Sequence, residues 1–557
     1  MANIWPWLLA AVVLGRLAYL RYYNKLNKFD GPFLASFTNL WRAWNLCGTK
    51  NRMPIAELHE RYGEVVRIGP NVLSFSNPDA IKEIYNKSFV KTPECSHFEK
   101  VGVLTRGVQQ SEFYSVAAGV NKGVAVQTLF SQTDEVYHDK LRRSLASAYS
   151  MSNVMQYEPF VDKTIDVFLE QMDHRFAGKE GPDGIVDLPQ WMRAYAFDVI
   201  GELTYGERHG FLDSGGDVEG IVSSLRKAVA YGQLIGTVPF LDYLFWRNPV
   251  LLWLSKRGWY DATSPTVPFA VRHLGSRLKA AGGGNDSIET KWEGREDLLA
   301  KFLNAKRDNP GLINDRTVLG LSLSMVNAGG DTTAITLSAL FYHLLKFPRC
   351  LDKLLEELDG KTPAERLPSD DPSFKRIIGW REAQQLPYLE ACVKETFRIH
   401  PSLSLFLERK VPASGATVAG HQVPGGIIVG CNAWALHRNK AVWGDDVEAY
   451  RPERWLECDA EVAALRNRTL FQFGAGSHTC LGKNISLLEM YKLVPSFLRT
   501  FEVRPEYIPF LVIHARGPAN TSALRQITLN EPEKDWTVLN IGFIEVADFT
   551  VRIRRRS

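Results

Sequence analysis

The sequence predicts a mainly α fold with small β-sheets, an α+β arrangement in which helices form the body of the protein. Helical hydrophobic patterns dominate from about residue 130 to 400. Strand-like patterns are confined to residues 65–75, 409–430 and 539–555. The chain has 557 residues, of which 45% are hydrophobic. That composition is sufficient for one large core.

The first element is an apolar segment over residues 4–20, at the short limit for crossing a bilayer. Trp5 and Trp7 lie at its outer end, and basic residues follow its other end. By the positive-inside rule the rest of the chain is then cytosolic. We therefore predict a single-pass membrane anchor at residues 1–23. The alternatives are a helix lying in the membrane interface, because Arg16 interrupts the apolar run, and a signal peptide, for which a basic start and a cleavage site are lacking.

A linker is predicted over residues 24–50 and a single domain over residues 51–557. Length alone would allow several domains. We favour one, because the motifs described below lie along one continuous stretch. Within it, residues 65–75 alternate β-branched and other residues around a Gly-Pro-Asn turn, which predicts a hairpin.

A long helix is predicted over residues 314–347, ended by Pro348. Its middle reads AGGDTT (residues 328–333), and each glycine costs a helix about 1 kcal/mol relative to alanine. Such a locally costly sequence in an apolar helix indicates a functional site. We expect the two glycines to open a groove, Thr332 to hydrogen-bond bound oxygen, and Asp331 to relay protons from solvent. The alternative is a close helix contact with Asp331 as a solvated charge.

Two further motifs carry charges that can pair. The helix expected over residues 387–400 contains the sequence ETFR, in which Glu395 and Arg398 share one face. The later sequence YRPERW adds Arg454. As three unrelated surface charges they would contribute little, since exposed ion pairs are worth roughly 0–1 kcal/mol. We predict instead one buried network that fixes the loop carrying Cys480.

That loop reads FGAGSHTCLG. It matches the pattern F-x-x-G-x-x-x-C-x-G at four spaced positions: Phe473, Gly476, Cys480 and Gly482. Glycines let backbone approach a flat macrocycle. The helix expected over about residues 481–501 points its N-terminus at the sulfur, which favours the ionised thiol. The pattern therefore predicts that Cys480 offers a thiolate to haem iron. The alternative is an ordinary buried thiol.

Charge and cysteine content exclude several classes of protein. The net charge is +4, and no basic run stands out except at the C-terminus, so nucleic-acid binding has no support. The seven cysteines are scattered without C-x-x-C pairs. This argues against a disulfide framework and a zinc site, and it fits a reducing, cytosol-facing location.

Together the four motifs AGGDTT, ETFR, YRPERW and FGAGSHTCLG resemble the cytochrome P450 superfamily of haem-thiolate monooxygenases, over nearly the whole chain from about residue 30. The resemblance implies the cytochrome P450 fold and haem b (iron protoporphyrin IX) with Cys480 as axial ligand. It also implies Asp331 and Thr332 in oxygen activation, and a structural triad of Glu395, Arg398 and Arg454.

The resemblance also implies cations for the haem propionates. Arg142 and Arg409 stand where the family places propionate partners. His138 takes a position commonly held by tryptophan. His478 takes one commonly held by arginine, so its charge depends on pH. Phe473, Gly476 and Gly482 complete the expected cofactor-binding set.

The implied reaction is insertion of one atom of dioxygen into a C–H bond of a lipophilic small molecule. The expected pocket is lined by the 95–125 loop, the helix before Gly329, Ser402–Leu407 and the 541–544 turn. The chain has no flavin- or nicotinamide-binding motif. Electrons would therefore come from a partner protein, and the resemblance implies that this is NADPH–cytochrome P450 reductase, with NADPH as the electron source, at the endoplasmic reticulum membrane. Three cations could dock it, or be plain surface charges: Lys140, Arg143 and Lys483.

More narrowly, the stretches at 67–85, 138–154 and 197–212 are similar to the fungal pisatin demethylase-like group, which implies secondary metabolism or detoxification of phytoalexins and xenobiotics. Residues 504–529 form an unusual insert before the last hairpin. It is either a lineage-specific loop or a translated intron. Two alternative functions are a haem-thiolate isomerase or dehydratase that needs no external electrons, and a haem sensor without turnover. The acid–threonine pair argues against both.

Overall fold

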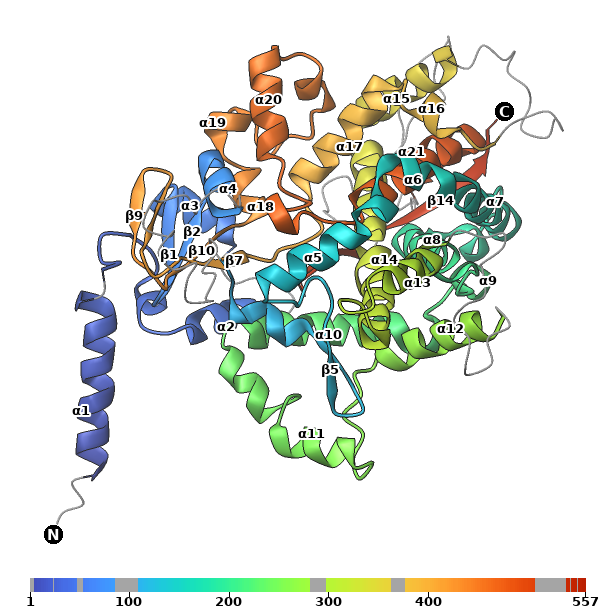
Figure 1. Ribbon diagram of the computed structural model, residues 1–557. Helices are drawn as coiled ribbons and strands as arrows, with labels where there is room; N and C mark the ends of the chain where they lie inside the picture. Colours follow the sequence, from blue (N-terminus) through green and yellow to red (C-terminus); the bar gives the residue numbers. More distant parts are fainter. Residues whose placement is uncertain are drawn as a thin grey trace.

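The computed structural model describes residues 5–23, 25–47, 54–85, 109–280, 297–361, 376–505, 537–540, 542–547 and 549–556. Within these residues the architecture is mainly helical with small sheets, as predicted (Figure 1).

The helices of the N-terminal half are α1 Trp5–Ala18, α2 Leu40–Leu46, α3 Ile55–Tyr62, α4 Pro78–Tyr85, α5 Glu135–Leu145, α6 Met151–Val154, α7 Glu158–Arg175, α8 Leu188–Tyr205, α9 Phe211–Ser214, α10 Ile221–Gly236 and α11 Pro249–Lys256. The later helices are α12 Val267–Ala280, α13 Leu298–Asp308, α14 Asp315–Lys346, α15 Pro348–Lys361, α16 Trp380–Ala383, α17 Pro387–Ile399, α18 Ala433–Leu436, α19 Lys440–Trp443, α20 Ala460–Thr469 and α21 Lys483–Thr500.

The strands are β1 Val65–Gly69, β2 Val72–Phe75, β3 Gln109–Gln110, β4 Gly119–Asn121, β5 Val124–Val126, β6 Val186–Asp187, β7 Leu407–Lys410, β8 Ala416–Val418, β9 His421–Val423, β10 Ile428–Cys431, β11 Phe501–Pro505, β12 Thr537–Asn540, β13 Ile544–Ala547 and β14 Thr550–Arg555. The largest sheet has the order β1-β2-β10-β7-β3, and a second has the order β11-β14-β6.

The long helix α14 crosses the middle of the molecule, beside α8 and α13 (Figure 1). It begins at a capping box, in which the Asn314 side chain accepts from the Thr317 N–H and the Thr317 hydroxyl bonds the Asn314 N–H. It ends at Phe347, before Pro348, which cannot continue a helix from the preceding residue. The prediction for residues 314–347 is therefore confirmed.

The largest sheet joins segments that are far apart in the sequence. β1 and β2 form the predicted hairpin, and β10 pairs with β2 in parallel and with β7 in antiparallel fashion. In Figure 1 the N-terminal strands accordingly lie beside β10 and β7. This sheet carries Arg409 on β7, so it contributes to the functional site as well as to the core.

The N-terminal helix α1 projects from the body and continues as a π-helix over Tyr19–Tyr23 (Figure 1). No helix in the described part of the chain is long and apolar enough to cross a membrane. The predicted membrane-spanning anchor is therefore not confirmed. Of the predicted insert, Arg504 and Pro505 belong to β11, and residues 506–529 lie outside the described residues.

Candidate functional site

Cys480 lies in a tight loop between Phe473 and the start of α21. Its backbone N–H donates to the Phe473 carbonyl oxygen at 2.8 Å, which closes the loop. Gly476 has a φ of 68°, and a Cβ at this position would lie 1.7 Å from the carbonyl oxygen of Tyr85. Glycine is therefore required both for the backbone conformation and for the close approach of α4.

The Cys480 thiol lies in the interior and is nevertheless accessible. The residue is exposed by surface area, yet burial is the main influence on its thiol and raises the pKa. A side chain that lines an internal space has both properties: its surface is accessible, and it is surrounded by protein atoms. The backbone N–H groups of Gly482 and Lys483, at the start of α21, and the charge of Arg142 act in the opposite direction and favour the thiolate.

Two arginines of this region, Arg142 near the thiol and Arg409 near His478, have no carboxylate partner among the described residues. Arg142 on α5 is half-buried, and its guanidinium forms no hydrogen bond or ion pair with them. Burial lowers its pKa, while the nearby Cys480 raises it. Arg409 is buried, donates to the Tyr114 hydroxyl at 3.1 Å and lies over the rings of Tyr85 and Tyr114. Buried cations normally have anionic partners, so both positions suit carboxylate groups of a ligand.

His138 and His478 stack on one another, with ring centroids 3.9 Å apart and an interplanar angle of 19°. His478 Nε2 lies 2.9 Å from the Glu135 carboxylate. Burial is the main cause that lowers the pKa of His138, to about 4, and it also lowers the pKa of His478. Glu135, His138 and His478 resemble a metal-ligand cluster by distance. However, nearly parallel stacked rings direct their lone pairs in separate planes, so the two imidazoles cannot converge on one ion.

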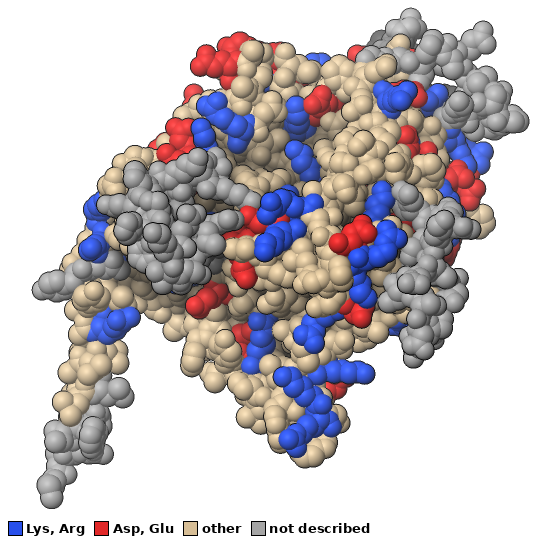
Figure 2. Space-filling view, viewed as in Figure 1, with Lys and Arg blue, Asp and Glu red and all other residues tan. Residues whose placement is uncertain are grey.

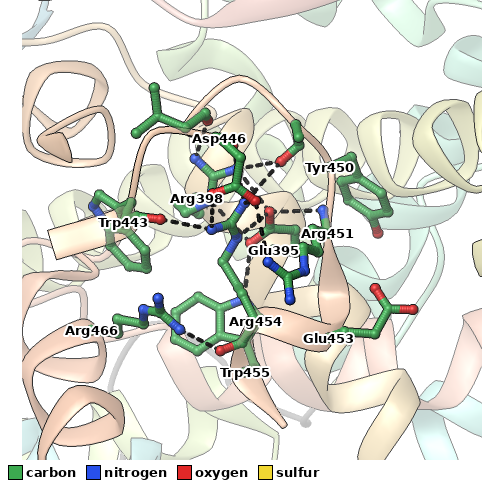
Figure 3. A network of polar contacts seen from close by, with 12 residues as sticks. Glu395, Arg398, Trp443, Asp446, Tyr450, Arg451, Glu453, Arg454, Trp455 and Arg466 are labelled. Carbon is green, nitrogen blue, oxygen red and sulfur yellow. Dashed lines mark hydrogen bonds and ion pairs between the residues drawn. The ribbon is translucent and has the colours of Figure 1, made fainter. Parts of the chain in front are cut away.

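The three predicted triad residues form one buried network (Figure 3). Arg398 donates to both oxygens of Glu395, at 2.7 and 3.0 Å, and Arg454 Nε donates to Glu395 Oε1 at 2.9 Å. The Trp455 indole N–H adds a bond to Glu395 at 3.0 Å. Arg454 also pairs with the Asp446 carboxylate at 3.1 Å, so two carboxylates face the two guanidinium groups. The other guanidinium N–H groups donate to backbone carbonyls of the segment 437–449. Every charge is thus compensated, which is the condition under which buried ion pairs are tolerated.

The network reaches the cysteine loop through His437, which sequence reasoning missed. Its Nδ1 lies 3.1 Å from the Arg398 carbonyl oxygen, and its Nε2 accepts from the Phe471 N–H at 2.8 Å. Burial lowers the pKa of His437 to about 3, so the ring is neutral and its proton is on Nδ1. Phe397 also packs edge-on against Phe473 at 5.1 Å. The triad therefore supports the first residues of the loop that carries Cys480.

The two glycines in the middle of α14 have a different role from the one that we expected. A Cβ on Gly329 would lie 2.4 Å from Ile200, and one on Gly330 would lie 2.7 Å from Phe197. The expectation that the glycines open a groove was wrong, because they allow α8 to pack closely. Asp331 is nonetheless buried and not a solvated charge, and Arg193 Nε donates to its Oδ1 at 2.7 Å.

Thr332 and Ala328 are accessible, although most of α14 around them is buried. The Thr332 hydroxyl donates to the Ala328 carbonyl at 2.8 Å, which leaves its oxygen free to accept. Thr333, the next residue, lies 3.2 Å from Ser486 of α21. The accessible stretch of α14 therefore lies close to the helix whose N-terminus follows Cys480.

A separate cavity of about 1200 Å³ lies away from the thiol. It is lined by parts of the predicted substrate pocket, including Phe113, Ser404 and Ile544, and by Gln233 and Asn540, which sequence reasoning missed. Cys480 and α14 do not line it. Residues 95–108 of the predicted pocket loop and Ile541 lie outside the described residues.

The residues present fit a haem group. A flat iron macrocycle with two carboxylates needs a ligand for its iron, cations for its carboxylates and an accessible surface beside it. The protein offers an accessible thiol with backbone N–H groups directed at it, two arginines without carboxylate partners among the described residues, and an accessible stretch of α14. His478 also borders the arginines, although it is already bonded to Glu135. Arg193, His437 and Glu135 carry no motif signal, and only their contacts identify them.

Comparisons with known proteins agree with this geometry. The family model described as cytochrome P450 matches residues 34–509. The cytochrome P450 monooxygenase cicH of Emericella nidulans is 36% identical over 542 residues, which is 97% of this chain and 96% of that protein. A cytochrome P450 monooxygenase of Aspergillus terreus is 38% identical over 496 residues, 88% of this chain and 93% of that protein. One of Aspergillus flavus is 34% identical over 490 residues, 87% and 89% of the two chains.

Proposed function

This chain belongs to the cytochrome P450 family, and from that premise we propose that it hydroxylates or otherwise oxidises a lipophilic small molecule with dioxygen and electrons from NADPH. The observation that carries the proposal is the internal but accessible Cys480 beside Arg142, whose guanidinium has no carboxylate partner among the described residues. The fungal sources of the relatives support a role in secondary-metabolite biosynthesis or in detoxification. We further propose that residues 51–557 form one catalytic domain.

In this mechanism the Cys480 thiolate would bind the haem iron, and Arg142 and Arg409 would bind the haem carboxylates. When bound, the haem supplies dioxygen activation. The chain's own residues supply protons and orientation. Burial raises the pKa of Asp331, so its carboxyl group can keep a proton inside the protein, and its Oδ2 has no partner among the described residues. Thr332, the next residue on α14, presents a hydroxyl oxygen that can accept a hydrogen bond in the accessible stretch of this helix.

Electrons would come from NADPH–cytochrome P450 reductase. Lys140 and Arg143 on α5 and Lys483 at the start of α21 are exposed. Lys483 acts on the thiol together with Arg142, and Lys140 and Arg143 lie on the same helix as Arg142. An acidic partner surface could dock there, and its attraction would weaken as salt concentration rises.

The test is incubation of the protein, reductase and NADPH with an extract of lipophilic metabolites under ¹⁸O₂. We expect a product that carries one ¹⁸O atom, and we expect it to be absent when NADPH or the reductase is omitted. A product formed without NADPH and without the label would instead indicate an isomerase or dehydratase. Spectral binding of ligands with no product from any compound class would indicate a sensor. Either result would overturn the proposal.

We also propose that the chain attaches to the endoplasmic reticulum membrane, with its catalytic domain on the cytosolic side. The side chains of α1 are largely exposed, including Trp7 at 76%. A second exposed apolar set lies between α10 and α12: Phe240, Tyr243, Leu244, Phe245, Trp246, Val250, Trp253, Trp259 and Tyr260. Trp and Tyr favour the membrane interface, and an exposed apolar surface of this kind marks an interaction site.

The two exposed segments extend to the same side of the molecule. In Figure 1, α1 and α11 both project downward from the body, and Figure 2 shows basic side chains on the lobe around α11. Lys256 and Arg257 belong to this lobe, and Arg257 lies 4.2 Å over the Trp253 ring. Cations beside interfacial tryptophans suit the anionic lipids of a cytosolic leaflet.

We expect the full chain to float with vesicles that contain anionic lipid. Replacing both tryptophans in Trp253→Ser/Trp259→Ser should reduce the bound fraction, because two interfacial anchors are lost. The control is Leu456→Ser, which removes an exposed apolar side chain of a different segment and should leave flotation unchanged. Equal flotation of the double variant and the control would exclude the α11 lobe. Failure of the full chain to float would exclude membrane attachment.

A further inference from the structure

Two arginines meet where the N-terminal helix α1 leads into the body of the protein (Figure 1). Arg67 on β1 is 2% exposed, and its Nη2 donates to the carbonyl oxygen of Leu20, just after α1, at 2.8 Å. The same nitrogen donates to the Ser36 carbonyl oxygen at 3.3 Å. The guanidinium of Arg21 lies over the ring of Phe33, 5.9 Å from its centroid. Both cations therefore contact one short 3-10 helix, Phe33–Ser36.

Neither guanidinium has a carboxylate partner in the described part of the chain. The hydrogen bonds of the Arg67 side chain all go to backbone carbonyl oxygens, which include Gly69 at 3.3 Å and Pro70 at 2.9 Å. Its Nη1 forms none with the described residues. Arg21 Nε is buried and also has no hydrogen-bond partner among them. A buried donor that lacks an acceptor is costly, so the site suits a ligand that supplies acceptors.

The two positive charges also repel one another. The pKa of Arg67 is lowered to about 10, first by burial and then by the charge of Arg21. Arginine nevertheless keeps its charge at neutral pH, so the repulsion persists there. Like charges that are held together without an anion destabilise a site. An anion between the two guanidinium groups would remove the repulsion and supply the missing acceptors.

The surface around the two arginines is apolar. The rings of Tyr22 and Phe33, which the Arg21 guanidinium contacts, are exposed, and so is Leu34. Exposed aliphatic side chains continue along α1: Leu8, Val12, Val13 and Leu14. A free anion would leave these side chains in water. A lipid would cover them with its acyl chains while its headgroup reached the arginines.

We propose that Arg21 and Arg67 form a binding site for the phosphate group of a membrane phospholipid, whose acyl chains lie along α1. Phosphate oxygens would accept from Arg21 Nε and Arg67 Nη1, and the planar fork of arginine suits such oxygens. Because Arg67 also binds the Leu20 carbonyl oxygen, the lipid, the end of α1 and the hairpin β1-β2 would form one network. This inference rests on the proposed function, since it assigns a ligand to the proposed membrane attachment.

The test is native mass spectrometry of the haem-loaded full chain in micelles of a non-ionic detergent. The probe is dihexanoyl phosphatidic acid, a short-chain phospholipid. Inorganic phosphate and dihexanoylglycerol carry its headgroup and its acyl chains separately. We expect the wild type to bind one molecule of phosphatidic acid at saturation. Inorganic phosphate should bind at least roughly tenfold more weakly, because it covers no apolar surface, and dihexanoylglycerol should not saturate a site.

The variant Arg21→Gln should bind phosphatidic acid roughly tenfold more weakly, because a charge-assisted hydrogen bond is lost. Arg21→Lys should restore part of the affinity, since lysine keeps the charge but not the fork. The control is Lys25→Gln, which removes an exposed charge from the same segment and should bind as the wild type does. Arg67→Lys should also bind more weakly, and Arg21→Gln decides the question if Arg67→Lys does not fold.

Three results separate the possible failures. Equal affinities of Arg21→Gln and Lys25→Gln for phosphatidic acid would overturn the site. Equal binding of inorganic phosphate and phosphatidic acid by the wild type would overturn the lipid assignment and indicate a free phosphate ligand. The proposed membrane attachment fails separately, if the full chain does not float with vesicles, and the proposed oxidation fails if the wild type incorporates no ¹⁸O.

Discussion

The Cys480→Ser variant is expected to lose the strongly red-shifted Soret band that marks a thiolate opposite carbon monoxide in the reduced protein. Serine preserves the size of the side chain, and the loop that Phe473 and Gly476 shape can remain folded. A hydroxyl group does not supply the anionic sulfur that favours O–O cleavage. Product formation should therefore fall to the level of an assay without protein. The measurement is the difference spectrum of the dithionite-reduced microsomal protein with and without carbon monoxide.

The matched control for this experiment is Cys47→Ser. Cys47 is a free cysteine at the surface, after α2, so its replacement should leave the spectrum unchanged. A red-shifted band that survives in Cys480→Ser would show that another residue binds the iron. A wild-type protein whose band lies where histidine- or thiol-ligated haem absorbs would contradict the thiolate assignment itself.

The Glu395→Gln variant should be strongly destabilised. Glu395 accepts from Arg398, Arg454, the Trp455 indole and the Arg451 backbone N–H, and it is fully buried. The amide keeps the shape but removes the charge that compensates two buried guanidinium groups. Breaking a buried pair in this way costs about 3–5 kcal/mol. We expect a lower thermal midpoint and a smaller fraction of haem-loaded protein.

The control for this variant lies on the same helix. Glu390 pairs with Lys394 at 2.8 Å, but its side chain is 49% exposed. Exposed pairs contribute roughly 0–1 kcal/mol, so Glu390→Gln should unfold close to the wild-type temperature. If both variants unfold at the same temperature, the triad does not stabilise the fold.

The sequence predicted the elements whose signals are local. The limits of α14 follow from Asn314 and Pro348, and the hairpin at residues 65–75 follows from its turn. The four motifs also indicated the residues around Cys480. The structure confirms the predicted fold class and brings Glu395, Arg398 and Arg454 together.

The unexpected features all depend on contacts between distant segments. Arg193 on α8 contacts Asp331, and His437, the residue after α18, contacts Phe471, yet neither position carries a periodic or motif signal. The sequence could not decide what the helix-destabilising pair Gly329-Gly330 is for. The same absence of a side chain can serve a ligand or a neighbouring helix, and only the position of α8 decides between them.

The parallel pairing of β2 with β10 has a consequence for how the protein is made. Val72 pairs with Ile428 and Phe75 with Cys431, so β2 has to wait for a partner that is synthesised much later. At translation rates of 5–20 residues per second this interval is roughly 20 to 70 s. Throughout it the hydrophobic hairpin has an open edge, which is a hazard for aggregation. Slower translation would lengthen that exposure, so the yield of folded protein should depend on chaperones that shield the nascent chain.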